Sequence, residues 1–150
     1  MNISQFLKKD IFKPQLESRD KMGVIEELVS LISNTKKVKN KKALLEAIIK
    51  REELESTGIG EGVAVPHART DAVKDVAIAF GLSKEGVEFD SVDRKPANFI
   101  FLVVAPKKKD IEYIKLLASV ARLLSRGDFR KKARKISSYK EMIELIKRYE

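Results

Sequence analysis

The sequence contains no cysteine and no tryptophan, and it has one histidine among its 150 residues. Without cysteine the chain cannot form disulfides, a thiol nucleophile or a cysteine-ligated metal site. One histidine cannot supply the set of imidazoles that a zinc site without cysteine needs. These absences exclude thiol chemistry and a histidine-cluster zinc centre from the functions that the sequence predicts.

The sequence also lacks a long apolar segment. No apolar run approaches the roughly 18 to 20 residues of a membrane helix. The N-terminus, MNISQFLKKD, does not combine a basic region with the long apolar stretch of a secretory signal. We therefore expect a cytoplasmic protein with no membrane insertion.

Acidic residues are fewer than basic ones: the sequence has 22 Asp and Glu and 31 Lys and Arg, which gives a net charge of +9. Basic residues cluster at 36–42, 107–109 and 130–135. Such clusters can attract nucleic acid, but aromatic residues for base stacking are not interleaved with them. A charged, solvated surface is the alternative, and we do not expect nucleic acid as a partner.

The apolar pattern predicts two helices before any strand. Residues 20–32 have apolar side chains on one helical face, and Asp20 or Ser18 is a suitable N-cap. Asn40 can cap a second helix that runs to about Glu53.

Short continuous apolar runs then follow at 63–65, 76–82 and 99–105, and continuous runs are typical of strands covered on both faces. Helical spacing returns after Pro106. Asp128 is the expected cap of a short basic helix, and Ser138 with Glu141 forms a capping box for a last one. The expected inward stripe of the helix after Pro106 is Ile111, Ile114, Leu117, Ala118, Ala121 and Leu124.

With 43% apolar residues and no linker, residues 1–150 are expected to fold as one domain. The order of helices, strands and helices predicts the α/β class, as a single-domain sandwich with a central mixed β-sheet flanked by helices.

The single histidine, His67, directly follows Pro66 in the most glycine-rich stretch of the chain, where Gly58, Gly60 and Gly62 fall within five positions. Glycine permits positive φ and a close backbone approach, and proline suits a strand that is ending. We therefore expect His67 at the end of a short strand, with Arg69 and Thr70 beside it.

Several chemistries are excluded around this histidine. The G-x-S-x-G elbow of serine hydrolases is absent. The glycines read G-x-G-x-G, which is not the dinucleotide fingerprint, and the P-loop-like spacing after Gly81 has Val87 where lysine is required. His67 is then either a partly buried structural residue or a lone nucleophile. Arginine and the N–H groups of a glycine-rich turn would suit a phosphoryl group on it.

The same residues carry a family resemblance. Residues 51–54 (REEL) and 56–69 (STGIGEGVAVPHAR) resemble the active-site signature of the fructose/mannitol-type enzyme IIA domains of the bacterial phosphotransferase system (PTS), which include nitrogen-regulatory IIA-like proteins. The likeness continues through 84–89, 103–106, 115–118 and 121–124. It covers nearly the whole chain and implies a PTS EIIA type-2 domain over residues 1–150.

The resemblance implies that His67 accepts a phosphoryl group from phospho-HPr on Nε2, as a tele-phosphohistidine, and passes it to a IIB component. By position, Arg51 is the family's active-site arginine. Arg69 and Thr70 are further candidates for stabilising the phosphate, and Arg69 is equally readable as a solvated loop charge. No metal or nucleotide cofactor is implied, because the phosphoryl group arrives already activated.

One position departs from the family. Many relatives have a second histidine at the start of the helix after Pro106, and Tyr113 stands in its place here. Tyrosine can donate a hydrogen bond to a phosphoryl oxygen but is uncharged near neutrality. Tyr113 is thus either an accessory site residue or a rim residue of that helix.

The resemblance leaves two roles open. One is a phosphocarrier for sugar uptake that hands its phosphoryl group to a IIB component. The other is a stand-alone nitrogen-regulatory protein whose phosphorylation state controls its binding to target proteins. The sequence shows no fused IIB, IIC or HPr domain, which fits the regulator, although transport IIA proteins also occur alone.

Overall fold

The computed structural model describes residues 1–150 as helices packed on both faces of a six-stranded mixed sheet. The strand order is β1-β5-β6-β3-β2, and β4 also pairs with β6. β5 and β6 are antiparallel, while β1 is parallel to β5 and β3 and β4 are parallel to β6. The strands are β1 (Phe12–Lys13), β2 (Gly58–Gly60), β3 (Val63–Ala64), β4 (His67–Arg69), β5 (Ala77–Val87) and β6 (Ala97–Ala105).

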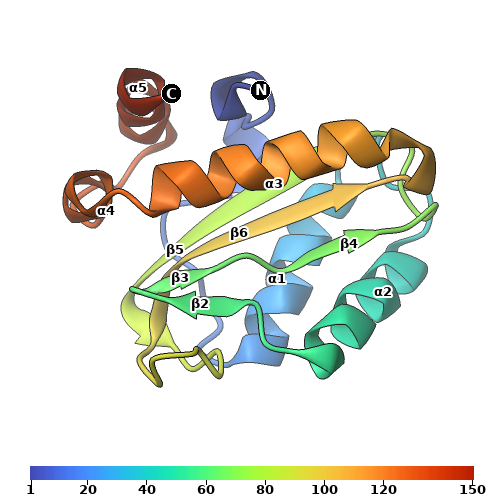
Figure 1. The fold of residues 1–150 in the computed structure, drawn as a ribbon, viewed down its shortest axis with the longest axis horizontal. Helices are drawn as coiled ribbons and strands as arrows, with labels where there is room; N and C mark the ends of the chain where they lie inside the picture. Colours follow the sequence, from blue (N-terminus) through green and yellow to red (C-terminus); the bar gives the residue numbers. More distant parts are fainter.

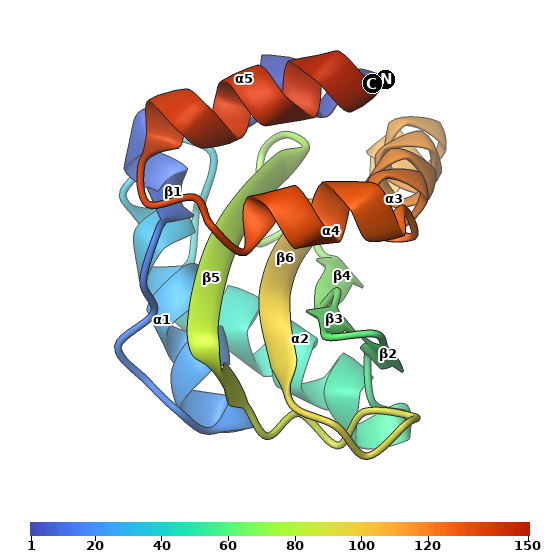
Figure 2. The same ribbon diagram turned by 90° about the vertical axis from the view of Figure 1, so that its left-hand side faces the viewer.

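Five α-helices enclose this sheet. α1 and α2 cover one face, while α3, α4 and α5 lie on the other side (Figure 1), and Figure 2 shows the same layers from the side. The prediction of a single α/β sandwich with a mixed sheet is confirmed. The helices are α1 (Lys21–Ser33), α2 (Lys41–Leu54), α3 (Asp110–Leu124), α4 (Gly127–Ala133) and α5 (Tyr139–Tyr149), and short 3-10 turns span Ile3–Gln5, Lys9–Ile11 and Lys107–Lys109.

The core is centred on β5 and β6, whose apolar runs are buried on both faces. Phe80 and Phe101 are cross-strand partners, and their rings stack with centroids 4.0 Å apart. The continuous apolar runs of β5 and β6 therefore correspond to strands that are covered on both faces, as expected for interior strands.

Side chains cap three of the helices. Asp20 accepts the Gly23 N–H at 2.7 Å at the start of α1, and Asn40 accepts the Ala43 N–H at 3.0 Å at the start of α2. Ser138 accepts the Glu141 N–H at 3.3 Å at the start of α5. These interactions satisfy N–H groups that have no partner within a helix.

The expected cap of α4 is wrong. Arg126 precedes this helix without a side-chain cap, and Asp128 lies inside its first turn. An acidic residue in the first turn also favours a helix start through the helix dipole. The aspartate at position 128 therefore indicated where α4 begins, but its place is in the first turn and not at the N-cap.

The expected inward stripe of α3 is also wrong in large part. Ile111 and Ile114 are 69% and 58% exposed. Leu124 of the expected stripe is buried, and Leu117 is partly buried against the core. The other residues that face the core are Tyr113, Leu116, Ser119, Val120 and Leu123. α3 has apolar residues on two faces, and helical periodicity alone cannot decide which face the sheet covers.

His67 does not end a strand; it begins one. β3 ends at Ala64, and β4 starts at His67. The pairing with β6 keeps one register across the gap, from Ala64 opposite Ile100 to His67 opposite Val103. Pro66 has no N–H, but its carbonyl still accepts the Val103 N–H at 3.0 Å. Pro66 therefore separates β3 from β4, but the pairing with β6 continues in the same register on both sides of it.

The N-terminal twenty residues contribute β1, for which the sequence offered no pattern. This strand is two residues long, and Phe12 pairs with Phe80 of β5. No helix of the structure is both long and apolar enough to cross a bilayer.

Candidate functional site

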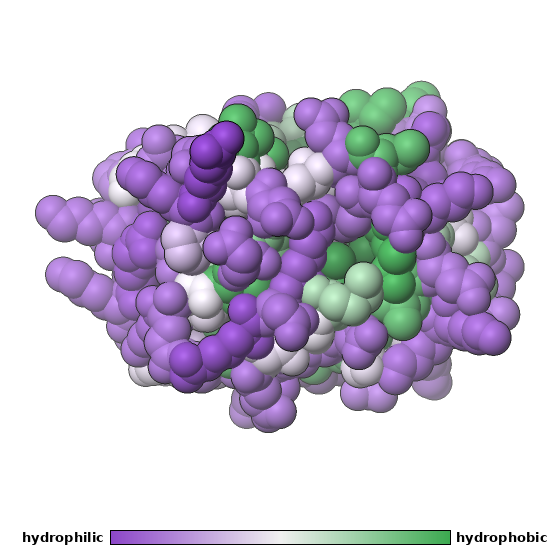
Figure 3. Space-filling model, turned by 90° about the horizontal axis from the view of Figure 1, so that it is seen from below, coloured by the Kyte–Doolittle hydropathy of each residue, from purple (hydrophilic) through white to green (hydrophobic).

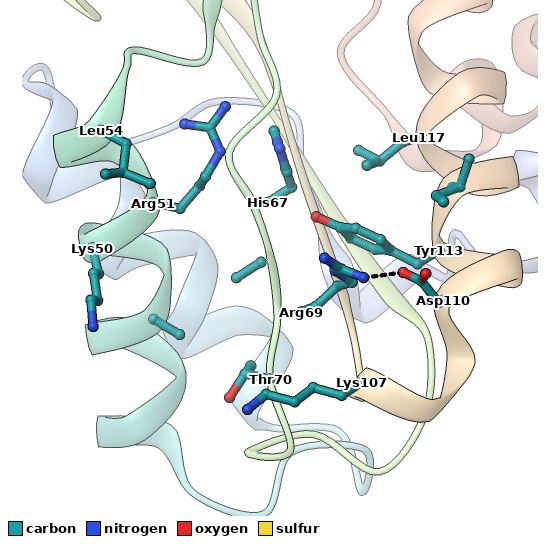
Figure 4. A pocket seen from close by; sticks show the side chains of 13 residues that line it. Lys50, Arg51, Leu54, His67, Arg69, Thr70, Lys107, Asp110, Tyr113 and Leu117 are labelled. Carbon is teal, nitrogen blue, oxygen red and sulfur yellow. Dashed lines mark hydrogen bonds and ion pairs between the residues drawn. The ribbon is translucent and has the colours of Figure 1, made fainter.

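A cleft of about 790 Å³ lies between the end of α2, β4 and the start of α3. Figure 4 shows the side chains that line it. Four of them are basic, Lys50, Arg51, Arg69 and Lys107, and Asp110 is the single acidic one. His67 and Tyr113 also line the cleft, which therefore offers a neutral imidazole within a positively charged wall.

The His67 imidazole is oriented by its own backbone neighbourhood. Its Nδ1 lies 2.6 Å from the Val65 carbonyl oxygen. Because a carbonyl only accepts, Nδ1 must hold the ring proton and Nε2 the lone pair. Nε2 has no hydrogen-bond partner in the protein. This tautomer presents the unprotonated nitrogen for chemistry.

The electrostatic surroundings keep this ring neutral. Burial lowers the pKa of His67 below its usual 6.5, and the nearby positive charge of Arg51 lowers it further. The Val65 hydrogen bond and the Glu52 carboxylate act in the opposite direction. With a lowered pKa, the imidazole keeps its lone pair at neutral pH.

Arg51 lies in the last turn of α2 and lines the same cleft as His67. Its Nη1 donates to the Glu55 carbonyl at 2.8 Å, and the side chain makes no ion pair. The remaining guanidinium N–H groups are therefore available to an anion.

Arg69 is engaged differently, because its guanidinium pairs with Asp110 at the start of α3 and lies 5.9 Å from the centre of the Tyr113 ring. The Thr70 hydroxyl accepts the Ala72 N–H at 3.2 Å, which stabilises the turn after β4. Figure 4 shows Thr70 beside Lys107, at the end of the cleft away from His67. Both residues line the cleft, but neither is as free as Arg51.

The Tyr113 ring is buried beside the histidine, with a centroid 6.2 Å from that of His67. Burial raises the pKa of Tyr113 to about 12. The phenol is therefore a neutral hydrogen-bond donor across the physiological range. Its hydroxyl points toward the His67 side of the cleft (Figure 4).

The glycine-rich turn is not part of this site. Gly60, Glu61 and Gly62 have φ values of +93°, +58° and +77° and form the tight link between β2 and β3. Gly62 lines a separate cavity together with Arg130 and Arg134 of the α4 region. The expected N–H donors for a phosphoryl group therefore lie away from His67. These glycines are required by the turn itself.

Sequence reasoning missed Lys50 and Lys107, which also line the cleft. Lys50 precedes Arg51 on α2, and Lys107 is the first residue of the 3-10 turn after Pro106. The basic cluster at 107–109 was visible in the sequence, but only the fold brings one of its members to the cleft of His67.

Exposed apolar residues border the cleft. Leu54 and Ile114 line it and are 81% and 58% exposed. Ile59 and Val92, also exposed, line an adjoining depression that reaches His67. Apolar side chains gather only in patches on the largely hydrophilic face seen in Figure 3.

Comparison with known proteins gives consistent matches. The model of the family described as "Phosphoenolpyruvate-dependent sugar phosphotransferase system, EIIA 2" matches residues 5–149. The fructose-specific EIIABC component of Bacillus subtilis is 37% identical over 150 residues, which are 100% of this chain and 24% of that protein. The chain thus spans about a quarter of that relative.

Solved structures share the fold. The nitrogen regulatory protein IIA-Ntr of Neisseria meningitidis is 30% identical, with a TM-score of 0.88 over 96% of this chain and 98% of that one. The enzyme IIAMTL in a complex with phosphorylated enzyme IIBMTL from Escherichia coli is 21% identical, with a TM-score of 0.81 over 94% and 96%. Sugar-specific and nitrogen-regulatory proteins therefore both stand among the similar proteins.

Proposed function

This chain belongs to the EIIA 2 family of the phosphoenolpyruvate-dependent sugar phosphotransferase system, and from that membership we propose that it carries a phosphoryl group on Nε2 of His67. The single observation that carries the proposal is the hydrogen bond from Nδ1–H to the Val65 carbonyl. It leaves a neutral, unpartnered Nε2 in a basic cleft. We propose that the group comes from phospho-HPr and goes on to a IIB component in fructose/mannitol-type sugar uptake in the cytoplasm.

The step is an in-line displacement at phosphorus. The Nε2 lone pair forms the new N–P bond while the donor's N–P bond breaks, and its electron pair returns to the donor imidazole. The product has positive charge on the His67 ring, which the Val65 carbonyl stabilises through Nδ1–H. No proton needs to leave. Catalysis of this kind depends mainly on positioning and charge stabilisation.

Arg51 is assigned to the phosphoryl oxygens, because its guanidinium has no carboxylate partner in the cleft. A planar fork of N–H donors matches such oxygens. Arg69 would first have to release Asp110, so it has a secondary role. Tyr113 supplies a neutral donor, whereas Thr70 acts mainly in the turn.

The partner surface follows from the apolar border. An HPr-type protein must bring its phosphorylated residue to this cleft, and a IIB protein must bring its acceptor residue to the same cleft. Leu54 and Ile114 lie where such a partner would be in contact. The IIAMTL–IIBMTL complex supports a IIB protein as one occupant.

A regulatory role is the alternative, and it is favoured by the Neisseria meningitidis IIA-Ntr structure, which matches 96% of this chain. In that role the phosphohistidine controls binding to a target protein instead of delivering a phosphoryl group to IIB. The chemistry at His67 is the same for both roles.

The experiment that tests the proposal is incubation with phosphoenolpyruvate, enzyme I and HPr, followed by intact-mass measurement. We expect an increase of one phosphoryl group that is acid-labile and absent in His67→Gln. No modification with several active HPr donors would contradict the proposal. Adding a fructose-type IIB domain then separates the roles, because rapid loss of the group to IIB supports transport and retention supports regulation.

A further inference from the structure

We propose that Glu52, which is next to Arg51 on α2, is a positioning residue for His67 and acts through Thr57 and Val65. This inference rests on the proposed function, since it concerns how His67 is prepared for phosphoryl transfer. The geometry behind it is a continuous path of hydrogen bonds from the buried Glu52 carboxylate to the imidazole.

The path begins at Thr57, just before β2. The Thr57 backbone N–H lies 3.2 and 3.3 Å from the two Glu52 carboxylate oxygens, and the Thr57 hydroxyl donates to one of them. Thr57 is buried, so its position depends on these contacts and not on water.

The path continues through the backbone. The Thr57 carbonyl accepts the Val65 N–H at 3.0 Å. The Val65 carbonyl in turn accepts the His67 Nδ1–H at 2.6 Å. Because the N–H of Val65 is fixed by Thr57, the orientation of the peptides around Val65, and so of the oxygen that selects the His67 tautomer, depends on Thr57.

The carboxylate itself is held by a charge. Lys21 Nζ lies 2.7 Å from Glu52 Oε2, and the Glu52 side chain is 6% exposed. Lys21 also lies 5.2 Å from the centre of the Phe89 ring and 3.6 Å from the exposed Asp90 carboxylate. A buried carboxylate needs such a partner and several donors to stay charged. Glu52 has both, although it lines neither the cleft nor its apolar border.

The location of Glu52 adds a second consequence. Adjacent residues on a helix point about 100° apart, so one turn of α2 supplies Arg51 to the cleft and Glu52 to the interior. The segment that leads to β2 is thus tied twice to α2, by Arg51 at Glu55 and by Glu52 at Thr57. This arrangement sets the placement of the guanidinium relative to the imidazole.

The test uses the fact that His67 is the only histidine. Nitrogen-15 spectra of the imidazole then report a single ring, without assignment, in the unphosphorylated protein. We expect the wild type to show a proton on Nδ1 and a lone pair on Nε2. Thr57→Val, which removes the hydroxyl but no charge, should reduce the Nδ1–H population and slow phosphoryl acceptance roughly three- to tenfold.

Glu52→Gln should show the same loss of the Nδ1–H form, together with a lower pKa of His67 because a nearby negative charge is gone. Thr57→Ser restores the hydroxyl and should recover both readouts. Glu53→Gln is the matched control, since Glu53 is the exposed neighbour on the same helix, and it should change neither. If Glu52→Gln does not fold, Thr57→Val and Thr57→Ser decide the question.

A folded Thr57→Val protein with an unchanged tautomer, pKa and transfer rate would overturn the role of Glu52. A loss of thermal stability without a change in the imidazole spectrum would also overturn it, because that pattern belongs to a purely structural residue. These spectra need no HPr. Failure of phosphoryl acceptance in the wild type therefore contradicts the proposed function and is distinguishable from failure of this inference.

Discussion

At the scale of single residues, His67 and Arg51 have complementary states. The imidazole is neutral with a free Nε2, and the guanidinium is charged with no carboxylate partner. They are sixteen positions apart in the sequence and come from α2 and β4. The cleft between these elements brings the proposed nucleophile and the proposed anion-binding group together before any partner arrives.

Replacement of Arg51 tests this pairing. Arg51→Gln is expected to slow phosphoryl acceptance by roughly a hundredfold, as for the loss of a preorganised donor to transition-state charge. Arg51→Lys should be intermediate, since lysine keeps the charge but lacks the planar fork. Rapid-quench measurement with phospho-HPr gives the rates. Arg69→Gln is the comparison, and an Arg69 effect larger than that of Arg51 would reverse the assignment.

The pKa of His67 leads to a second prediction. Since burial and Arg51 hold this pKa below 6.5, the ring should bind a proton only as the pH falls below that value. Protonation removes the Nε2 lone pair, so phosphoryl acceptance should be constant at neutral and higher pH and should fall to half its maximum at a pH below 6.5. Imidazole spectra over the same range give the midpoint directly. A midpoint above 6.5 would contradict the prediction, and Arg51→Gln should raise it.

At the scale of elements, α3 is the part of the fold that sequence patterns described least well. It packs on β6 through Tyr113, Leu116 and Val120, while Ile111 and Ile114 remain exposed. Both sets are apolar and both repeat at helical spacing. The choice between them depends on which side the sheet covers, and a one-dimensional pattern does not contain that information.

The two faces of α3 should respond differently to substitution. Ile114→Ser is expected to leave the free energy of unfolding within about 0.5 kcal/mol but to weaken the interaction with phospho-HPr roughly fivefold. Leu116→Ala should instead cost about 2 to 5 kcal/mol of stability. Urea unfolding and the dependence of the transfer rate on HPr concentration separate the effects. An Ile114→Ser variant with unchanged transfer would remove this face from the partner surface.

The other elements followed local rules more closely. Asp20, Asn40 and Ser138 were predictable as caps because a cap depends on neighbours within three residues. β1 was not predictable, since two residues have no period and its partner in β5 lies far along the chain. The start of β4 at His67 was missed for the same reason, because pairing with β6 continues across Pro66.

At the scale of the whole molecule, the sheet joins all parts around β5 and β6. Both termini also lie close together, where the Ser4 N–H donates to the Glu150 carboxylate at 3.2 Å (Figure 2). Helices on both faces share one buried apolar cluster that extends from Ile3 to Ile146. A chain with one continuous core is expected to unfold in one step.

Phe101→Ala tests whether the chain unfolds in one step, because Phe101 is fully buried in β6 and stacks on Phe80. The substitution should lower the free energy of unfolding by about 3 to 5 kcal/mol. Urea unfolding followed by circular dichroism and by the signal of the single histidine ring should give coincident transitions in both proteins. Separate transitions would show that the region of His67 unfolds independently of the core.

The fold class, the caps of α1, α2 and α5, and His67 as the candidate nucleophile were all predictable from the sequence. These depend on local spacing, on composition and on a motif of adjacent residues. Only the tertiary structure decided the tautomer of His67, the freedom of Arg51, the pairing of Arg69 with Asp110 and the removal of the glycine-rich turn from the site. Each of these depends on which distant groups come within hydrogen-bond distance of one another, and such proximity is a property of the packed chain.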